Sequence, residues 1–138
     1  MRLLLADDRP KTRFALRALL RLQTGLAVVG EAATAGELLA LAEKTSPDIV
    51  LLDWGLQGLQ ADELLPALQS ICPNIYVIAL SSRPEVRDAA LAAGADAFVS
   101  KIDSPERLLM AIADYERLNR GKENAKGCPS AALSSLDP

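Results

Sequence analysis

The sequence contains no histidine and only two cysteines, and both scarcities exclude functions. Without histidine the chain has no serine–histidine triad and no histidine acid–base catalysis, and it cannot itself carry a phosphohistidine. Cys72 and Cys128 are far apart and lack the spacing of metal ligands. This excludes a zinc cluster and predicts thiols in a reducing compartment rather than a disulfide framework.

Long apolar runs and an excess of basic residues are also missing. No stretch reaches the roughly 20 apolar residues that span a membrane, and Asp7 and Asp8 follow the start of the chain too soon for a signal peptide. The formal net charge of −3 disfavours nucleic acid as the main partner, because phosphate contacts need a basic surface. We therefore expect a soluble, cytoplasmic protein that does not enter a membrane and does not bind DNA by itself.

The pattern of apolar residues predicts one α/β domain. The 138 residues are 50% hydrophobic, and short apolar runs alternate five times with helical patterns, which is typical of βαβ units around a buried parallel sheet. The predicted strands are 2–6, 27–32, 49–53, 75–80 and 97–100, and the predicted helices are 10–23, 35–45, 62–71, 84–93 and 105–120. We expect a domain over 1–120 and a flexible tail over 121–138. The alternative for the tail is docking through Leu133 and Leu136.

Local signals support the ends of these helices. Residues 82–85 fit a capping box, and Ser104 followed by Pro105 pairs an N-cap serine with a proline in the first turn. Gly94 stands where a helix that ends at Ala93 needs a residue with positive φ.

Five polar residues stand at the carboxyl ends of four predicted strands. In strand order they are Asp7, Asp8, Asp53, Ser81 and Lys101. Ligands of open parallel α/β sheets bind at this edge, so we expect the five side chains to converge there. Taken singly, each has an ordinary explanation: Asp8 as a helix cap, Ser81 as support for the next helix, and Lys101 as a solvated loop residue.

Three carboxylates at one edge require a cation, because a pair 4 Å apart repels by about 4 kcal/mol at an effective dielectric constant near 20. Lys101 supplies one charge, and Mg²⁺, which prefers oxygen ligands, would supply the rest. A carboxylate beside Mg²⁺ can attack a phosphoryl group and form an aspartyl phosphate. Asp53 is the best-placed nucleophile because it ends the central strand, and Ser81 is placed to donate a hydrogen bond to a phosphoryl oxygen.

Competing chemistries lack their motifs. Neither a G-x-x-x-x-G-K-[ST] loop nor a G-x-G-x-x-G turn follows the first strand, and Asp7 and Asp8 would repel the phosphate of a flavin. A G-x-S-x-G elbow is missing too. Gly55 stands where a haloacid-type phosphotransferase has its second aspartate.

Four segments, 4–10, 47–53, 77–81 and 93–101, resemble in order and spacing the bacterial response-regulator receiver domains, and the resemblance covers about residues 2–119. It implies a (βα)5 flavodoxin-like receiver fold with strand order 2-1-3-4-5. It also implies a switch of a two-component phosphorelay rather than an enzyme, one that promotes only its own phosphotransfer and autodephosphorylation.

The resemblance assigns a role to each residue of the site. Asp53 is the phosphoacceptor, and Lys101 pairs with the phosphoryl group. The Mg²⁺ ligands are Asp8 and Asp53 directly, the backbone carbonyl of Gly55, and Asp7 through water.

The resemblance also implies how the signal leaves the site. Ser81 moves to bond the phosphoryl group, and Phe98 is the aromatic switch residue, although an ordinary core phenylalanine would look the same in the sequence. The output is a changed surface on the fourth helix, fifth strand and fifth helix. The implied partners are a histidine kinase or phosphotransfer protein, a downstream protein that the sequence does not name, and a second copy in a homodimer through that surface.

Several positions depart from the family pattern. Gln57 replaces a usual proline, residues 60–61 replace Asp-Gly, and Ser82 replaces a smaller residue. These departures motivate the alternative of a degenerate receiver that acts as a phosphorylation-independent interaction module. Ile102 replaces a cis proline, so we expect a trans bond or an adjusted loop there, because a cis bond before isoleucine costs about 3–4 kcal/mol. The pattern over 101–106 resembles receivers joined to helix-turn-helix domains, here expected without that effector.

The first predicted helix carries arginines every four residues, at Arg13, Arg17 and Arg21. They stand opposite an apolar set, which consists of Ala15, Leu16, Leu19 and Leu22. The stripe is either a solvated helix face or a docking surface for the phosphoryl donor. Trp54, the single tryptophan, follows Asp53 and offers a fluorescence probe of the site.

Overall fold

Five strands form one parallel sheet in the order β2-β1-β3-β4-β5 in the computed structural model, which describes residues 1–58 and 60–120. The strands are β1 (Arg2–Ala6), β2 (Ala27–Ala32), β3 (Ile49–Asp53), β4 (Tyr76–Ser81) and β5 (Ala97–Ser100). The predicted fold class and strand order are confirmed, and β4 alone is displaced, by one residue, from its predicted bounds.

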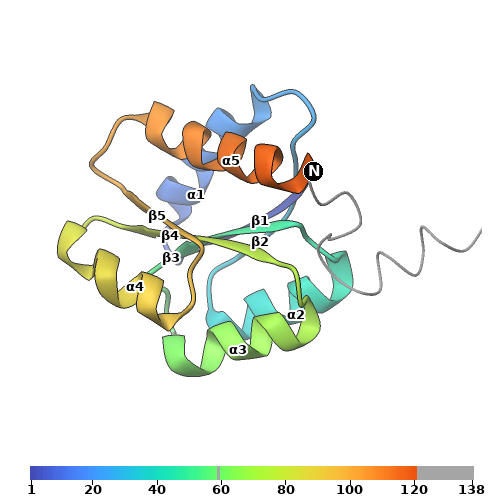
Figure 1. Ribbon diagram of the computed structural model, residues 1–138, viewed down its shortest axis with the longest axis vertical. Coiled ribbons are helices and arrows are strands. Elements are labelled where there is room, and N and C mark those ends of the chain that lie inside the picture. The colour runs from blue at the N-terminus through green and yellow to red at the C-terminus, as the bar shows by residue number, and fades with distance from the viewer. Residues whose placement is uncertain (59, 121–138) are drawn as a thin grey trace, which may run out of the picture.

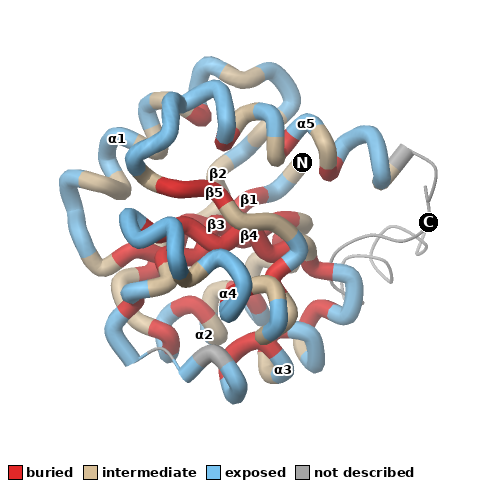
Figure 2. The backbone as a smooth tube through the Cα atoms, turned by 60° about the vertical axis from the view of Figure 1, so that its left-hand side comes forward, coloured by how far each residue is buried: buried red, intermediate tan, exposed pale blue. Residues whose placement is uncertain are grey.

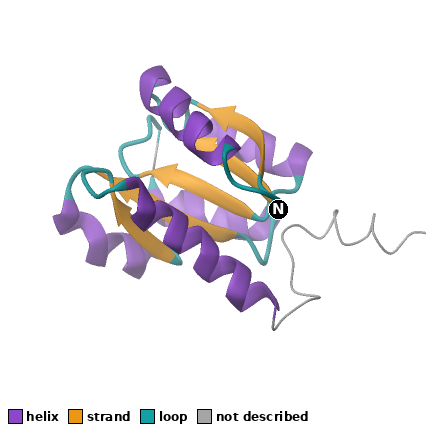
Figure 3. Cartoon of the chain, turned by 90° about the horizontal axis from the view of Figure 1, so that it is seen from above, coloured by secondary structure: helices purple, strands orange, loops and turns teal. Residues whose placement is uncertain are grey.

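Helices cover both faces of this sheet. They are α1 (Pro10–Arg21), α2 (Ala35–Thr45), α3 (Ala61–Ile71), α4 (Arg87–Ala93) and α5 (Pro105–Arg120), with a 3-10 turn, η1 (Pro84–Val86), before α4. α1 and α5 lie on one side and α2, α3 and α4 on the other (Figure 1), and the view from above shows the strands enclosed between them (Figure 3). Burial on both faces explains why the strands are continuous apolar runs.

The sheet separates two apolar cores. One lies under α2, α3 and α4 and includes Leu38, Leu52 and Leu68, and the other lies under α1 and α5 and includes Leu20, Leu51 and Ile112. The central strands are the most buried part of the chain (Figure 2). Leu51 and Leu52 are adjacent in β3 and face different cores, as the alternation of side chains along a strand requires.

The predicted capping box at 82–85 is wrong. The residue before η1 is Arg83, whose side chain makes no cap bond, and its backbone N–H donates to Oγ of Ser81 at 3.0 Å. The chain therefore turns around the Ser81 hydroxyl. The predicted helix over 84–93 divides into η1 and α4, with Gly94 at φ +121° after it, as the positive-φ prediction requires.

A side-chain cap forms instead at the start of α2. Thr34 accepts a hydrogen bond on Oγ1 from the backbone N–H of Glu37 at 3.2 Å, and the Glu37 carboxylate accepts one from the N–H of Ala33 at 2.7 Å. This reciprocal arrangement satisfies one donor that the first turn of the helix leaves open and one donor of the residue before the N-cap.

α1 differs from its prediction in length and in its buried face. It ends at Arg21 rather than at residue 23. Leu22, which belongs to the predicted apolar set opposite the arginines, is 78% exposed because it lies past the helix end, and Ala15 of the same set is exposed as well. Leu20 is the fully buried residue of this helix.

Two further expectations concern compartment and tail. Cys72 is buried and is not a free thiol, so the expectation of reduced thiols is not supported at that residue. Cys128 and the expected tail over 121–138 lie outside the described residues. Within 1–58 and 60–120, the helices are all too short or too polar to cross a membrane.

Tyr115 on α5 places a hydroxyl group in the core under α1 and α5. Its side chain is 7% exposed, its ring centroid lies 5.0 Å from that of Tyr76, and its hydroxyl has no hydrogen-bond partner among the described residues. Burial, and then the negative charge of Asp48, raises the pKa of Tyr115 to about 12 from an ordinary value of 10.0. The folded state thus keeps a proton that the unfolded chain loses, and the associated stability is lost as the pH rises from about 10 to about 12.

We expect Tyr115→Phe to raise the free energy of unfolding at pH 7 by about 1 kcal/mol, because a buried unsatisfied hydroxyl costs about 1–3 kcal/mol. The variant should also lose less stability than the wild type between pH 10 and pH 12. Urea unfolding followed by circular dichroism measures both effects. A variant less stable than the wild type at pH 7 would show that the hydroxyl has a partner.

Candidate functional site

Three carboxylates meet where β1 and β3 end. The strands are neighbours in register, with Ala6 opposite Leu52, so Asp7 and Asp53 follow at the same edge of the sheet. One carboxylate oxygen from each of Asp7, Asp8 and Asp53 lies within 4.8 Å of the others. Asp7 and Asp53 are 1% and 2% exposed, so their mutual repulsion is only weakly screened by solvent.

Lys101 provides the positive charge between two of them. Its Nζ lies 2.7 Å from Oδ2 of Asp7 and 3.0 Å from Oδ1 of Asp53, and its side chain is 14% exposed. Its backbone N–H donates to the carbonyl oxygen of Ser81 at 2.8 Å, which fixes the residue after β5 to the end of β4. Three carboxylates and one ammonium leave a charge of −2, which matches one divalent cation.

The two oxygens of Asp53 have different surroundings. Oδ1 lies beside Lys101 and also accepts the backbone N–H of Gly55 at 3.2 Å. Oδ2 is buried and has no hydrogen-bond partner among the described residues. A Cβ on Gly55 would stand 3.8 Å from both oxygens, so the glycine leaves this approach open. A bare buried oxygen and an uncompensated charge fit a hard cation such as Mg²⁺.

The ordinary explanation of Asp8 as a helix cap does not hold. The residue before α1 is Arg9, with no side-chain cap bond at the helix start. It is Asp7 that accepts the backbone N–H of Arg9, on Oδ1 at 2.9 Å. Asp8 is half-buried and takes part in the carboxylate cluster.

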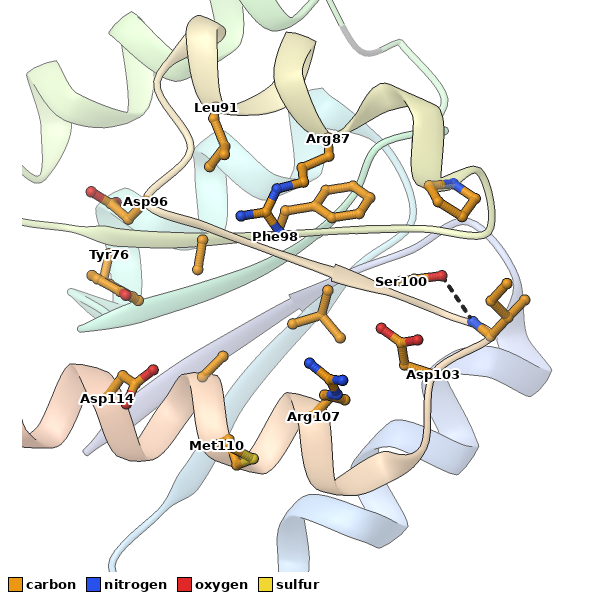
Figure 4. Close-up of a pocket in the computed structure, with 15 residues that line it drawn as sticks. Tyr76, Arg87, Leu91, Asp96, Phe98, Ser100, Asp103, Arg107, Met110 and Asp114 are labelled. Atoms are coloured by element: carbon orange, nitrogen blue, oxygen red, sulfur yellow. Dashed lines mark hydrogen bonds between the residues drawn. The ribbon is translucent and has the colours of Figure 1, made fainter.

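The two expected switch residues lie on adjacent strands. Ser81 is 7% exposed, and its Oγ accepts the N–H of Arg83, which leaves the hydroxyl hydrogen for another acceptor. Phe98 is half-buried, packs against the core under α2, α3 and α4, and lines a cavity of about 530 Å³ between α4 and α5 (Figure 4). Arg87 and Met110 line the same cavity.

The positions that depart from the family pattern have defined places. The backbone of Gln57 forms a parallel bridge to Thr34, and its carbonyl oxygen accepts the N–H of Ala35 at 3.0 Å, so the loop after β3 is tied to the start of α2. Ser82 is exposed. All described peptide bonds are trans, which confirms the prediction for Ile102.

The arginine stripe on α1 is only partly solvated. Arg13 and Arg17 both pair with the carboxylate of Glu31 on β2, while Arg21 is exposed. Arg13 also donates from Nη1 to the backbone carbonyl of Asp7 at 2.6 Å. Glu31 had no predicted role, although a single acid in an otherwise apolar strand is a signal that could have indicated one.

Comparison with known proteins agrees with this geometry. Residues 3–113 match the response regulator receiver domain family. The chain is 36% identical over 112 residues to the nitrate/nitrite response regulator protein NarL of Escherichia coli (strain K12), which covers 80% of this chain and 52% of NarL. The chain thus spans about half the length of the curated relatives it matches.

Solved structures show the same likeness. A two-component response regulator of the LuxR family from Aurantimonas sp. SI85-9A1 superposes with a TM-score of 0.75 at 33% identity, covering 82% of each chain. A DNA-binding response regulator of the LuxR family from Staphylococcus aureus superposes with a TM-score of 0.73 at 27% identity, covering 83% of this chain and 97% of that one. Fold, acidic site and matched sequence agree, and the chain belongs to the family of response regulator receiver domains, the signalling domains of two-component systems.

Proposed function

We propose that the chain is a phosphorylation switch whose acceptor is Asp53. The observation that carries this proposal is the asymmetry of that carboxylate. It is buried at the end of the central strand, with Oδ1 beside Lys101 and the Gly55 N–H and with Oδ2 lacking a partner among the described residues. Lys101 and the Gly55 N–H thus orient Oδ1, while Oδ2 would be the oxygen that attacks the phosphoryl group.

The transfer step is a displacement at phosphorus. A carboxylate oxygen of Asp53 attacks the phosphoryl group of a phosphohistidine, the P–N bond breaks, and its electron pair returns to the donor imidazole. Because the chain has no histidine, that phosphohistidine would belong to another protein, a histidine kinase or phosphotransfer protein. Lys101, already 3.0 Å from Asp53, neutralises charge on the phosphoryl oxygens.

The carboxylate cluster would hold Mg²⁺. Asp8 and Asp53 would bind it directly, the backbone carbonyl of Gly55 would complete the protein ligands, and Asp7 would contact it through water. The ion would supply the charge neutralisation that Lys101 alone cannot provide. Asp7, held by Lys101 at 2.7 Å and by the Arg9 N–H at 2.9 Å, keeps the pocket in shape.

The response would leave the site through Ser81. Its hydroxyl hydrogen can turn to a phosphoryl oxygen, and the N–H of Arg83 bonded to its Oγ joins that movement to η1 and α4. Phe98, which is half-buried and lines the cavity together with Arg87 of α4, would move inward as Ser81 engages the phosphoryl group. The changed surface is that of α4, β5 and α5, where a downstream protein or a second copy would bind in the cytoplasm. The chain itself would act as a signalling component and not as an enzyme on other substrates.

Phosphorylation itself can be measured directly. Incubation with acetyl phosphate and Mg²⁺, followed by intact-mass measurement, should add one phosphoryl group to the wild type and none to Asp53→Asn, which keeps the shape but removes the nucleophile. A wild type that gains no mass and binds no beryllofluoride would instead indicate a phosphorylation-independent interaction module.

The metal site can be tested with Trp54, which follows the acceptor and is half-buried against the core. We expect Mg²⁺ to change the Trp54 fluorescence of the wild type, and Asp8→Ala to abolish that change because a direct ligand is lost. Asp62→Ala, at an exposed acid on α3, is the matched control and should leave the titration unchanged. An Asp8→Ala titration like that of the wild type would remove Asp8 from the metal site.

A further inference from the structure

The backbone of Asp7 is held on both sides of its Cα. Its N–H donates to the carbonyl oxygen of Ala32 at 3.0 Å, which extends the pairing of β1 and β2 beyond β1. Its carbonyl oxygen accepts a hydrogen bond from Nη1 of Arg13 at 2.6 Å. That carbonyl belongs to the peptide between Asp7 and Asp8, so its orientation sets the direction in which both carboxylates leave the chain.

Glu31 fixes the arginine that makes this contact. Its Oε1 lies 3.3 Å from Nε of Arg13, while its Oε2 accepts from Nη1 of Arg17. The Arg13 and Glu31 side chains are 20% and 23% exposed, so solvent screens their attraction less than that of a surface pair. The planar guanidinium of Arg13 thus joins a carboxylate on β2 to a carbonyl oxygen at the site with separate nitrogens, as its fixed fork of donors allows.

We propose that Arg13, oriented by Glu31, is a positioning residue for the acidic pocket. Arg13 bonds the peptide before Asp8 and so acts on the carboxylates through their backbone. The two guanidinium groups and the Glu31 carboxylate carry a net charge of +1, which partly offsets the −2 of the carboxylates and Lys101. The inference rests on the proposed function, because it concerns the Mg²⁺ affinity of the same pocket.

Arg17 provides a matched control on the same helix. It pairs with the same carboxylate of Glu31 and carries the same charge, but the hydrogen bond to the Asp7 carbonyl comes from Arg13. A general loss of positive charge near the pocket would affect Arg13→Ala and Arg17→Ala alike. Loss of a specific bond to the Asp7–Asp8 peptide would affect only the first variant.

The experiment compares the wild type, Arg13→Ala, Arg13→Lys and Arg17→Ala by Mg²⁺ titration of Trp54 fluorescence. We expect about ten-fold weaker Mg²⁺ binding in Arg13→Ala, the loss typical of outer-shell partners of metal ligands, and less than a two-fold change in Arg17→Ala. Arg13→Lys keeps a charged donor but not the planar guanidinium, so its Mg²⁺ affinity should lie between those of the wild type and Arg13→Ala. It also keeps the test valid if the alanine variant does not fold.

A second readout does not depend on metal. The backbone N–H of Arg9 donates to Oδ1 of Asp7 at 2.9 Å, so its amide NMR shift reports the position of that carboxylate in the Mg²⁺-free protein. We expect this shift to move in Arg13→Ala and to stay within experimental error in Arg17→Ala.

The outcomes separate the two proposals. Equal affinities and equal Arg9 shifts in the two alanine variants would overturn the positioning role. A wild type without any response to Mg²⁺ would overturn the proposed metal-dependent function, and the Arg9 shift would then decide the positioning role by itself.

Discussion

The ammonium group of Lys101 lies between two buried carboxylates, and this contact holds together the edge of the sheet where the site forms. Lys101 follows the edge strand β5, whereas Asp7 follows the central strand β1 and Asp53 ends the central strand β3, so the contacts of 2.7 Å and 3.0 Å pass over the end of β4. Removing one partner of such a buried pair typically costs about 3–5 kcal/mol, because the remaining charge loses its compensation. The ion pairs of Lys101 therefore tie the residue after β5 to the ends of β1 and β3.

The excess negative charge at this edge of the sheet accounts for the other features of the site. Asp53 keeps one buried oxygen without a protein partner among the described residues, and the glycine two residues later places no side chain against it. Around this centre, backbone bonds do most of the positioning. The Asp7 carboxylate accepts the N–H of Arg9, and the Ser81 hydroxyl accepts the N–H of Arg83. A backbone hydrogen bond joins the loop after β3 to the start of α2. A rigid frame thus surrounds a charge that is not balanced.

Apolar patterning and topology were sufficient to predict the sheet and the convergence of the acidic residues. The short apolar runs at 49–53 and 97–100 are typical of buried strands. Parallel strands bring their carboxyl ends to one edge of the sheet, so Asp53 and Lys101 come together although they are far apart in the sequence. Bonds between a side chain and a distant backbone carbonyl leave no such periodic trace. In the sequence, Arg13 is one arginine of a stripe, and nothing there indicates its contact with the backbone of Asp7. Residues 82–85 match a capping pattern, but the chain does not form that cap because the N–H of Arg83 bonds to the Ser81 hydroxyl instead. The roles assigned to Phe98 and to the metal ligands came from family resemblance and not from the pattern.

The placement of β5 has a consequence for how a local event spreads. Within the described part of the chain this strand lies at the edge of the sheet and pairs with β4 alone, and its adjacent residues Phe98 and Val99 point into different cores. Phe98 packs in the core that contains α4, and Val99 in the core that contains α5. A displacement of this one short strand would therefore disturb both cores at once, and it would couple α4 to α5 although the sheet keeps their cores apart.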